Sequence, residues 1–293
     1  MTKRTVTNIA ASVHQRLKNE AAASGQVFNS LLQHYALERF IYRLSKSRHA
    51  GQFILKGALL LRVWGLPFAR PTRDIDLLGR TRNEAALIAE IIREVCTTAV
   101  SDDGLSFDSA TVSAAPIAED AAYQGIRVEL NGRLGNARIA MQIVIGFGDR
   151  ITPAAKVIEY PSVLGMERPR IHAYPPETSI AEKFQIMLYR GTLNSRMKDF
   201  FDIWALAQSL TFEGSVLADA IRATCKQRKT PVDEHPVAFS ELVLNDRSKQ
   251  VQWAAFRRRL GGAEAPATFL EVASSAARFL DPVIAAVARG LAF

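Results

Sequence analysis

Strand-forming patterns are confined to the middle of this chain, and this feature most limits the folds that it can adopt. Residues 105–149 contain three segments that alternate or run apolar, VSAAPI, GIRVEL and ARIAMQIVI, with Asn131–Gly132 between the last two. Asn-Gly is typical of a tight hairpin turn, so this region is predicted to be antiparallel β-structure. Two short strands are expected earlier, at residues 53–55 and 74–78, and strand signals stop from Pro161 onward.

Helical patterns fill both ends of the chain. The first predicted helix spans residues 8–23 and ends before Gly25, and a second begins near Phe28 with an apolar face and a basic face. The segments after Pro161 have helical spacing throughout. We therefore predict an α+β fold in three parts: an N-terminal helical segment (1–50), an α/β core with a mixed sheet (51–160) and a helical C-terminal domain (161–293).

Composition excludes several classes of protein. With 48% hydrophobic and 23% charged residues, the chain is ordinary for a soluble globular protein. No apolar run reaches the roughly 18 residues that cross a membrane, and the first 20 residues lack a secretory apolar segment. Cys96 and Cys225 have no metal-ligand spacing. A cytoplasmic protein without a membrane partner is expected.

The charge favours a polyanionic partner without proving one. The formal net charge is +8 and the sequence pI is near 9.7. Candidate contacts to an RNA backbone form two basic clusters: Arg222, Lys226, Arg228 and Lys229, and then Arg257, Arg258 and Arg259. A solvated helix face is an equally good explanation for each cluster.

Two aspartates interrupt the second expected strand, in the stretch RPTRDIDLLGR. Alternation along a strand places Asp74 and Asp76 on one face, roughly 6.5–7 Å apart, with Ile75 and Leu77 toward the core. Magnesium takes one or two protein carboxylates, and a pair of such ions can activate a hydroxyl and stabilise a leaving phosphate. The pair predicts a metal platform; the alternative is a strand edge with two ordinary surface aspartates.

A second candidate feature lies one strand earlier. Lys56–Gly57 joins the first strand to an expected helix, where a glycine lets a phosphate approach free backbone N–H groups. A glycine turn followed by Asp-x-Asp on the next strand resembles nucleotidyltransferases of the polymerase-β type, although Ala58 stands where that superfamily often has Ser or Gly. Thr72 and Arg73 flank the aspartates, where each can contact a phosphate or only solvent.

The helical part supplies the remaining candidates. Lys183 can offset triphosphate charge, or it can be a plain surface lysine. In RMKDFFD, Asp199 can orient that lysine or bind nucleotide, with Arg196 and Lys198 near phosphates, while Asp202 is expected to support the helix. A salt-bridged helix start is the alternative explanation for this segment.

A family resemblance connects these segments. FILKGALLLRVWG, RPTRDIDLLG, MQIVIGFGDRITP, YPPETSIAEKF and NSRMKDFFDIW, in this order, resemble the AbiEii/AbiGii-type (MenT-like) nucleotidyltransferase toxins of the polymerase-β-type superfamily. The match covers most of residues 8–205. These proteins are the toxin halves of bacterial toxin–antitoxin and abortive-infection operons.

The resemblance implies a fold and a reaction. It implies a polymerase-β-like nucleotidyltransferase core, with the nucleotide held between that core and the helical domain. The implied catalytic residues are Asp74 and Asp76 as metal ligands, Lys183 and Asp199, with Gly57 as the phosphate-approach turn. The implied cofactors are two Mg²⁺ ions, with Mn²⁺ as an alternative. NTP is the implied substrate, and its NMP goes to an RNA acceptor, above all the tRNA 3′ end, which blocks translation. An antitoxin encoded next to the gene is the implied partner; the sequence does not predict the oligomeric state, the NTP or the tRNA.

One position departs from the family pattern. The chain has Gln142-Ile143-Val144-Ile145 where the pattern is Gln-Ile-Asp-Ile, so Val144 stands at the expected third carboxylate. Either the aspartate pair suffices, or Glu129 or Asp149 substitutes, or activity is weakened. The alternative functions are a degenerate member that binds antitoxin or RNA without turnover, and a nucleotidyltransferase that modifies a protein or small molecule.

Overall fold

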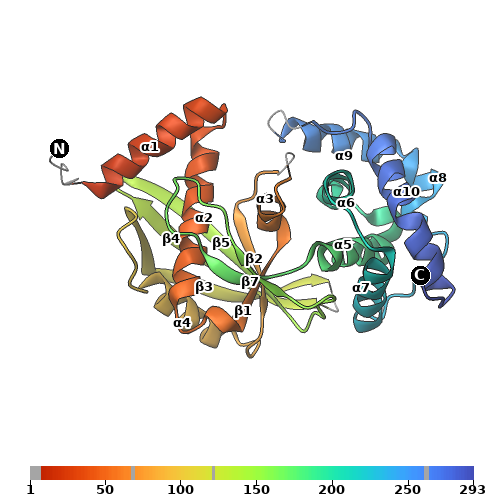
Figure 1. The fold of residues 1–293 in the computed structure, drawn as a ribbon, viewed down its shortest axis with the longest axis horizontal. Coiled ribbons are helices and arrows are strands. Elements are labelled where there is room, and N and C mark those ends of the chain that lie inside the picture. Colours follow the sequence, from red (N-terminus) through yellow and green to blue (C-terminus); the bar gives the residue numbers. More distant parts are fainter. Residues whose placement is uncertain (1–7, 67–69, 121–122, 261–263) are drawn as a thin grey trace. The chain divides into compact units, whose positions relative to one another are not determined.

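The computed structural model describes residues 8–66, 70–120, 123–260 and 264–293 (Figure 1). The chain forms two compact units, and each is assembled from three separate segments. Unit 1 comprises Met1–Leu59, Pro71–Gly148 and Val157–Ala173, and unit 2 comprises Leu60–Arg70, Asp149–Lys156 and Tyr174–Phe293.

A mixed sheet forms the centre of unit 1. In the described part of the chain it has seven strands in the order β3-β4-β5-β2-β1-β7-β6. The strands are β1 (Phe53–Lys56), β2 (Asp74–Gly79), β3 (Leu105–Asp120), β4 (Tyr123–Leu134), β5 (Ala137–Phe147), β6 (Lys156–Glu159) and β7 (Arg170–Ala173). The pairs β1–β2, β3–β4 and β4–β5 are antiparallel, whereas β2–β5 and β1–β7 are parallel. The predicted mixed α/β sheet is confirmed.

Two predictions about the strands are wrong. The hairpin turn lies at residues 135–136, and Asn131–Gly132 pairs within β4 against Ile139 and Ala140. This register keeps the buried residues of β4 and β5 on one face, which decides between two neighbouring turn candidates. Strands also do not stop before Pro161, because β7 follows it. With only Ile171 and Ala173 buried, its alternation is too short to stand out in the sequence.

The helices of unit 1 pack on this sheet. They are α1 (Ile9–Ser24), α2 (Phe28–Lys46) and α4 (Ala85–Cys96), with short 3-10 turns at Ala50–Gln52 and Gly57–Leu59. Asn8 caps α1 by accepting a hydrogen bond from Ala11 N at 2.9 Å, and Gly25 ends the helix at φ 67°. The predicted N-terminal helix is confirmed, because a cap residue and a left-handed glycine bracket it. Helix α2 contacts β5 and β7, and α4 contacts β3.

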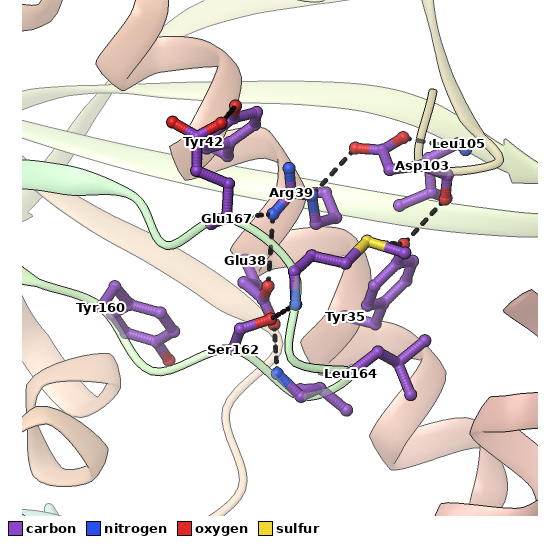
Figure 2. Close-up of polar contacts among 12 residues, drawn as sticks. Tyr35, Glu38, Arg39, Tyr42, Asp103, Leu105, Tyr160, Ser162, Leu164 and Glu167 are labelled. Atoms are coloured by element: carbon purple, nitrogen blue, oxygen red, sulfur yellow. Dashed lines mark hydrogen bonds and ion pairs between the residues drawn. The ribbon is translucent and has the colours of Figure 1, made fainter. Parts of the chain in front are cut away.

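Helix α2 carries charged side chains into the core of unit 1 (Figure 2). Arg39 donates to Asp103 at 2.9 Å, and Arg43 donates to both oxygens of the same carboxylate at 2.8 and 2.9 Å. Glu38 accepts from Val163 N at 2.7 Å. These contacts tie α2 to the segments that precede β3 and β7. Burial raises the pKa of Glu38, whereas for Asp103 burial is outweighed by Arg43 and Arg39, which hold its pKa below the usual range.

Unit 2 is helical, which confirms the predicted character of the C-terminal region. Its helices are α3 (Leu60–Val63), α5 (Pro176–Arg190), α6 (Met197–Ser209), α7 (Gly214–Gln227), α8 (Glu241–Leu244), α9 (Arg247–Arg258) and α10 (Phe269–Ala288), with 3-10 turns at Gly191–Leu193 and Val237–Phe239. Phe200 packs edge-on against Phe269, and Trp253 is buried, so aromatic side chains form the core between α6, α9 and α10. Among the described residues, no helix is both long and apolar enough to span a membrane.

Candidate functional site

The aspartate pair lies on one face of β2. Asp74 and Asp76 are half-buried, whereas Ile75 and Leu77 between and beyond them are 0% exposed. The alternation follows from the strand geometry, which turns successive side chains to opposite faces of the sheet. The core residues hold β2 in place, so the two carboxylates project together from the other face.

Gly57 brings the backbone against Asp76. Its φ is +74°, and a Cβ added there would lie 2.0 Å from Asp76 Oδ2. Only glycine permits both this backbone conformation and this approach. The expected helix after Gly57 is short, a 3-10 turn followed by the four residues of α3. Lys56, just before the turn, is the residue of β1 that lies opposite Asp76 in the register of β1 and β2.

The segment that leads into β2 is fixed by polar contacts. The amide of Asp74 donates to Thr72 Oγ1 at 3.4 Å. Gln33 of α2 donates to the carbonyl of Arg73 at 3.4 Å and to that of Ala140 at 3.1 Å. The side chain of Arg73 is exposed.

Val144 lies directly beside Asp76. In the parallel pairing of β2 with β5, Asp76 is opposite Val144 and Asp74 is opposite Gln142. Because laterally paired residues project to the same face, Val144 lies next to the aspartate pair, at the position where the resemblance predicted a third carboxylate. Glu129 is opposite Gln142 on β4, so it is two strands from Asp74, or roughly 10 Å at the usual strand spacing. Asp149 belongs to unit 2, where it forms an ion pair with Arg228 at 2.8 Å.

The donors on β2 suit a hard divalent cation. Within the described ranges there is no group of three or more His, Cys, Asp or Glu side chains placed to hold a metal. Two carboxylates on one face nevertheless meet the demand of Mg²⁺, which is held by one or two carboxylates and completes its shell with water and substrate oxygens. Asp74 and Asp76 are the residues that would hold such an ion.

Lys183 is held by two buried carboxylates in unit 2. Its Nζ lies 2.7 Å from Asp202 Oδ2 and 3.3 Å from Asp199 Oδ1, and both aspartates are at most 1% exposed. Arg70 contacts both oxygens of Asp202 at 2.8 and 3.0 Å, and Arg196 contacts Asp199 at 2.7 Å. We call these five side chains the Lys183 cluster. The exposed Lys198 follows Met197 in the first turn of α6.

Electrostatics keep this cluster charged. Burial alone would lower the pKa of Lys183, but Asp202 and Asp199 outweigh it and raise that pKa above its usual value. Burial would likewise raise the pKa of Asp202, but Arg70 and Lys183 hold it at about 2. Lys183 and Arg196 hold the pKa of Asp199 below its usual range in the same way, against the effect of burial.

The cluster contains two residues that sequence reasoning did not place in the site. Asp202 is the nearer partner of Lys183, and it lies three residues beyond Asp199, where a helix turns both side chains to neighbouring faces. That spacing was a usable signal. Arg70 had none, because its partner Asp202 lies 132 residues away in the chain.

The basic clusters predicted to grip RNA are not uniform. Arg228 is largely buried in contacts with Asp149 and Gln185, and Arg222 pairs with Asp219 at 2.6 Å. These two arginines have structural partners. The side chains of residues 257–259, at the end of α9, are exposed.

Solved structures relate this fold to that of nucleotidyltransferase-like proteins. JHP933 of Helicobacter pylori and an H. pylori protein described as a candidate nucleotidyltransferase are each 15% identical, with a TM-score of 0.50. Each alignment covers 88% of this chain, and they cover 94% and 96% of those chains, respectively. MenT4, a nucleotidyltransferase toxin of Mycobacterium tuberculosis H37Rv, is 13% identical with a TM-score of 0.49, over 95% of this chain and 98% of that one.

The sequence gives the family. Residues 39–276 match the nucleotidyl transferase AbiEii toxins of type IV toxin–antitoxin systems. This match spans most of the chain, so the protein belongs to that family, and the predicted resemblance is confirmed. Among curated proteins the comparison finds no match.

Proposed function

We propose that this protein is a metal-dependent toxin that transfers NMP from an NTP to the 3′ end of an RNA, with tRNA as the first candidate. The observation that carries the proposal is the joint placement of Asp74 and Asp76 on one face of β2, with Gly57 pressed against Asp76. Membership of a nucleotidyltransferase toxin family supports the class of reaction. Transfer to the 3′ end of tRNA would block translation, and a cognate antitoxin would restrain it.

Asp74 and Asp76 hold the metal in this proposal. Mg²⁺, or Mn²⁺ in its place, would lower the pKa of the attacking hydroxyl and neutralise charge on the departing pyrophosphate. The protein fixes the two carboxylates through the core packing of Ile75 and Leu77. The turn at Gly57 lets the backbone approach Asp76 closely, because a Cβ there would lie 2.0 Å from Asp76 Oδ2.

Lys183 offsets negative charge on the triphosphate. An ammonium group is a compact cation that suits this role, and its raised pKa keeps it protonated at neutral pH. Asp199, Asp202 and Arg70 position it. Lys56, Thr72, Arg73, Arg196 and Lys198 are the proposed further contacts to the nucleotide.

The test is a transfer assay with matched variants. Purified protein is incubated with magnesium, total tRNA and each α-labelled NTP in turn. Label entering tRNA from one NTP, and lost in Asp74→Ala, is the expected result. Glu90→Ala is the control, because Glu90 is an exposed carboxylate of unit 1 that forms no ion pair with any described residue. Label that survives Asp74→Ala would refute the assignment of the pair.

Val144 favours a second candidate, a family member that binds RNA or antitoxin without turnover. A valine beside Asp76 removes one ligand and one negative charge from the proposed metal site. If no NTP labels RNA in the wild type, the same assay is repeated with Val144→Asp and with protein or small molecules as acceptors. Transfer by Val144→Asp alone would make this chain a crippled enzyme, and label in a protein or small molecule would change the acceptor.

A further inference from the structure

We propose that Arg127 of β4 binds a phosphate of the acceptor RNA strand, beside the position where its 3′ hydroxyl reacts. This inference rests on the proposed function. It assigns the acceptor side of the same site to β4, which lies beyond β5 from the predicted site residues on β1 and β2.

The sheet register places Arg127 in line with the aspartates. Arg127 is opposite Val144, Val144 is opposite Asp76, and Asp76 is opposite Lys56. Residues paired in this way across neighbouring strands project to one face, so the four side chains form one row. At the usual strand spacing, the Cα of Arg127 is roughly 10 Å from that of Asp76. In this row Asp76 therefore has Lys56 on one side, and on the other side it has Val144 and then Arg127.

Arg127 is available for a ligand. Its side chain is exposed, and it forms no hydrogen bond or ion pair with any residue in the described part of the chain. Its directly opposite neighbours are Val144 on β5 and Ala115 on β3, and neither carries a charge. Had residue 144 carried a carboxylate, an opposite-charge pair across β4 and β5 would be expected. Val144 therefore offers Arg127 no opposite charge across β4 and β5.

The chemistry favours a phosphodiester. Guanidinium binds phosphate oxygens through two parallel N–H bonds, which makes Arg the usual residue for this contact. The attacking hydroxyl has to reach the metal held by Asp74 and Asp76, so the last phosphates of its own strand lie close by on the same face. Lys56, the proposed nucleotide contact, is on the opposite side of Asp76 from Arg127. The row therefore separates a side for the NTP from a side for the acceptor.

On β4 and β5, one carboxylate and two further arginines share this face with Arg127. Glu129 lies two residues along β4 from Arg127 on the same face, roughly 7 Å away at the Cα atoms, and is opposite Gln142. Further along the same face, Arg133 is exposed and opposite Arg138. Arg133 is roughly 20 Å from Arg127 along the strand, which makes it a suitable control.

The experiment compares Arg127→Ala, Arg127→Lys and Arg133→Ala. Binding to total tRNA is measured by fluorescence anisotropy between about 50 and 200 mM salt. For Arg127→Ala we expect a Kd roughly tenfold higher, as loss of one charge-assisted contact predicts. The slope of log K against log salt should be smaller by about one. Arg127→Lys should keep the slope and recover part of the affinity, and Arg133→Ala should leave both unchanged. In the transfer assay, KM for tRNA should rise while KM for NTP stays constant.

The outcomes separate this inference from the proposed function. If the wild type transfers nucleotide to tRNA and Arg127→Ala behaves like Arg133→Ala, the inference is wrong and the function stands. If the wild type binds tRNA but transfers nothing, the proposed function is wrong. The role of Arg127 is then supported if Arg127→Ala raises the Kd for tRNA and lowers the salt slope, and it is overturned if neither changes. A wild type that does not bind RNA, or a rise in the KM for NTP instead of tRNA, would overturn the inference. Circular dichroism and thermal midpoints establish that the three variants fold.

Discussion

At the residue scale, Gly57 makes the position of Asp76 depend on a missing side chain. Gly57→Ala places a methyl group 2.0 Å from Asp76 Oδ2 at a positive φ. We expect a loss of about 1–3 kcal/mol in the free energy of unfolding. We also expect a drop of roughly a hundredfold in nucleotide transfer, since displacing a reacting group by 1 Å has that effect. Urea denaturation and the transfer assay measure the two quantities.

Gly165→Ala is the matched control for that variant. Gly165 has a similar φ of +67°, but a Cβ there has nothing within 4 Å. It carries the same backbone strain without contact to Asp76, so it should lose stability and keep its transfer rate. An equal loss of transfer in both variants would show that strain, rather than contact with Asp76, explains the effect.

Asp202 is the residue on which the Lys183 cluster depends. Asp202→Ala leaves Lys183 and Arg70 without their shared, fully buried carboxylate. Removing one partner from a buried ion pair typically costs about 3–5 kcal/mol, and we expect a loss of this size in urea denaturation. Asp219→Ala removes an exposed carboxylate from the partly exposed Arg222, so the loss should stay below about 1 kcal/mol. Similar losses in both variants would contradict a special role for Asp202.

The sequence predicts only part of each site at this scale. Strand alternation was enough to place Asp74 and Asp76 together, and the family motif was enough to pair Lys183 with Asp199. The sequence could not predict that Arg70 joins the Lys183 cluster, because a contact with Asp202, 132 residues away, leaves no local pattern. It also gave Asp202 a lesser role, since burial of a carboxylate depends on packing between helices that the sequence does not show.

At the element scale, the ion pairs between α2 and Asp103 make the stability of the fold depend on pH in the acid range. The pKa of Asp103 in the folded protein is below its ordinary value of 3.8, so its ion pairs stabilise the fold above that pH. This stability is lost as the pH falls from 3.8 through the folded pKa. Asp103→Asn should be about 3 kcal/mol less stable at pH 7, because it removes the buried carboxylate that pairs with Arg43 and with Arg39, and leaves Arg39 with its longer ion pair to Glu38.

The pH dependence tests that assignment. Urea denaturation between about pH 7 and pH 2 should show a smaller acid-induced loss in Asp103→Asn than in the wild type. Glu90→Gln is the control for loss of one carboxyl group, because Glu90 is exposed and forms no ion pair among the described residues. If Asp103→Asn and the wild type have parallel curves down to acid pH, Asp103 does not titrate as proposed.

The pairing of β2 with β5 gives the next prediction. Val144→Asp adds a carboxylate beside Asp76, on the face that carries the aspartate pair. We expect a rise in nucleotide transfer and a larger increase of Tm on addition of magnesium, because a third carboxylate strengthens cation binding. The asparagine side chain of Val144→Asn has nearly the same shape as aspartate but no charge, so this variant should show neither change. No rise with Val144→Asp would mean that this position is not a missing ligand.

Elements with strong local signals were predictable, and short or ambiguous ones were not. The first helix was found because Asn8 and Gly25 mark its ends. The hairpin was misplaced because Asn131–Gly132 and residues 135–136 both have turn chemistry, and only burial on the sheet decides between them. Strand β7 was missed because four residues give too little alternation.

At the scale of the whole molecule, charge sets how the proposed RNA partner binds. With a net charge of +8, affinity for tRNA should fall steeply with salt, by at least roughly tenfold between 50 and 200 mM if several phosphates are contacted. Anisotropy titrations across that range measure the fall. Affinity that is independent of salt would argue against RNA as the partner. The predicted limits of the three parts of the chain, 1–50, 51–160 and 161–293, stay a prediction.

The interleaving of the two units has a consequence for synthesis on the ribosome. Unit 1 cannot be completed until Ala173 has emerged, because β7 is its last strand. Arg70 emerges early but belongs to unit 2, and Asp202 follows 132 residues later. At about 5–20 residues per second, the nascent chain carries this arginine without its carboxylate for roughly 7 to 26 s. A message cut before codon 202 therefore yields a product in which Arg70 and Lys183 never acquire the carboxylate that joins them.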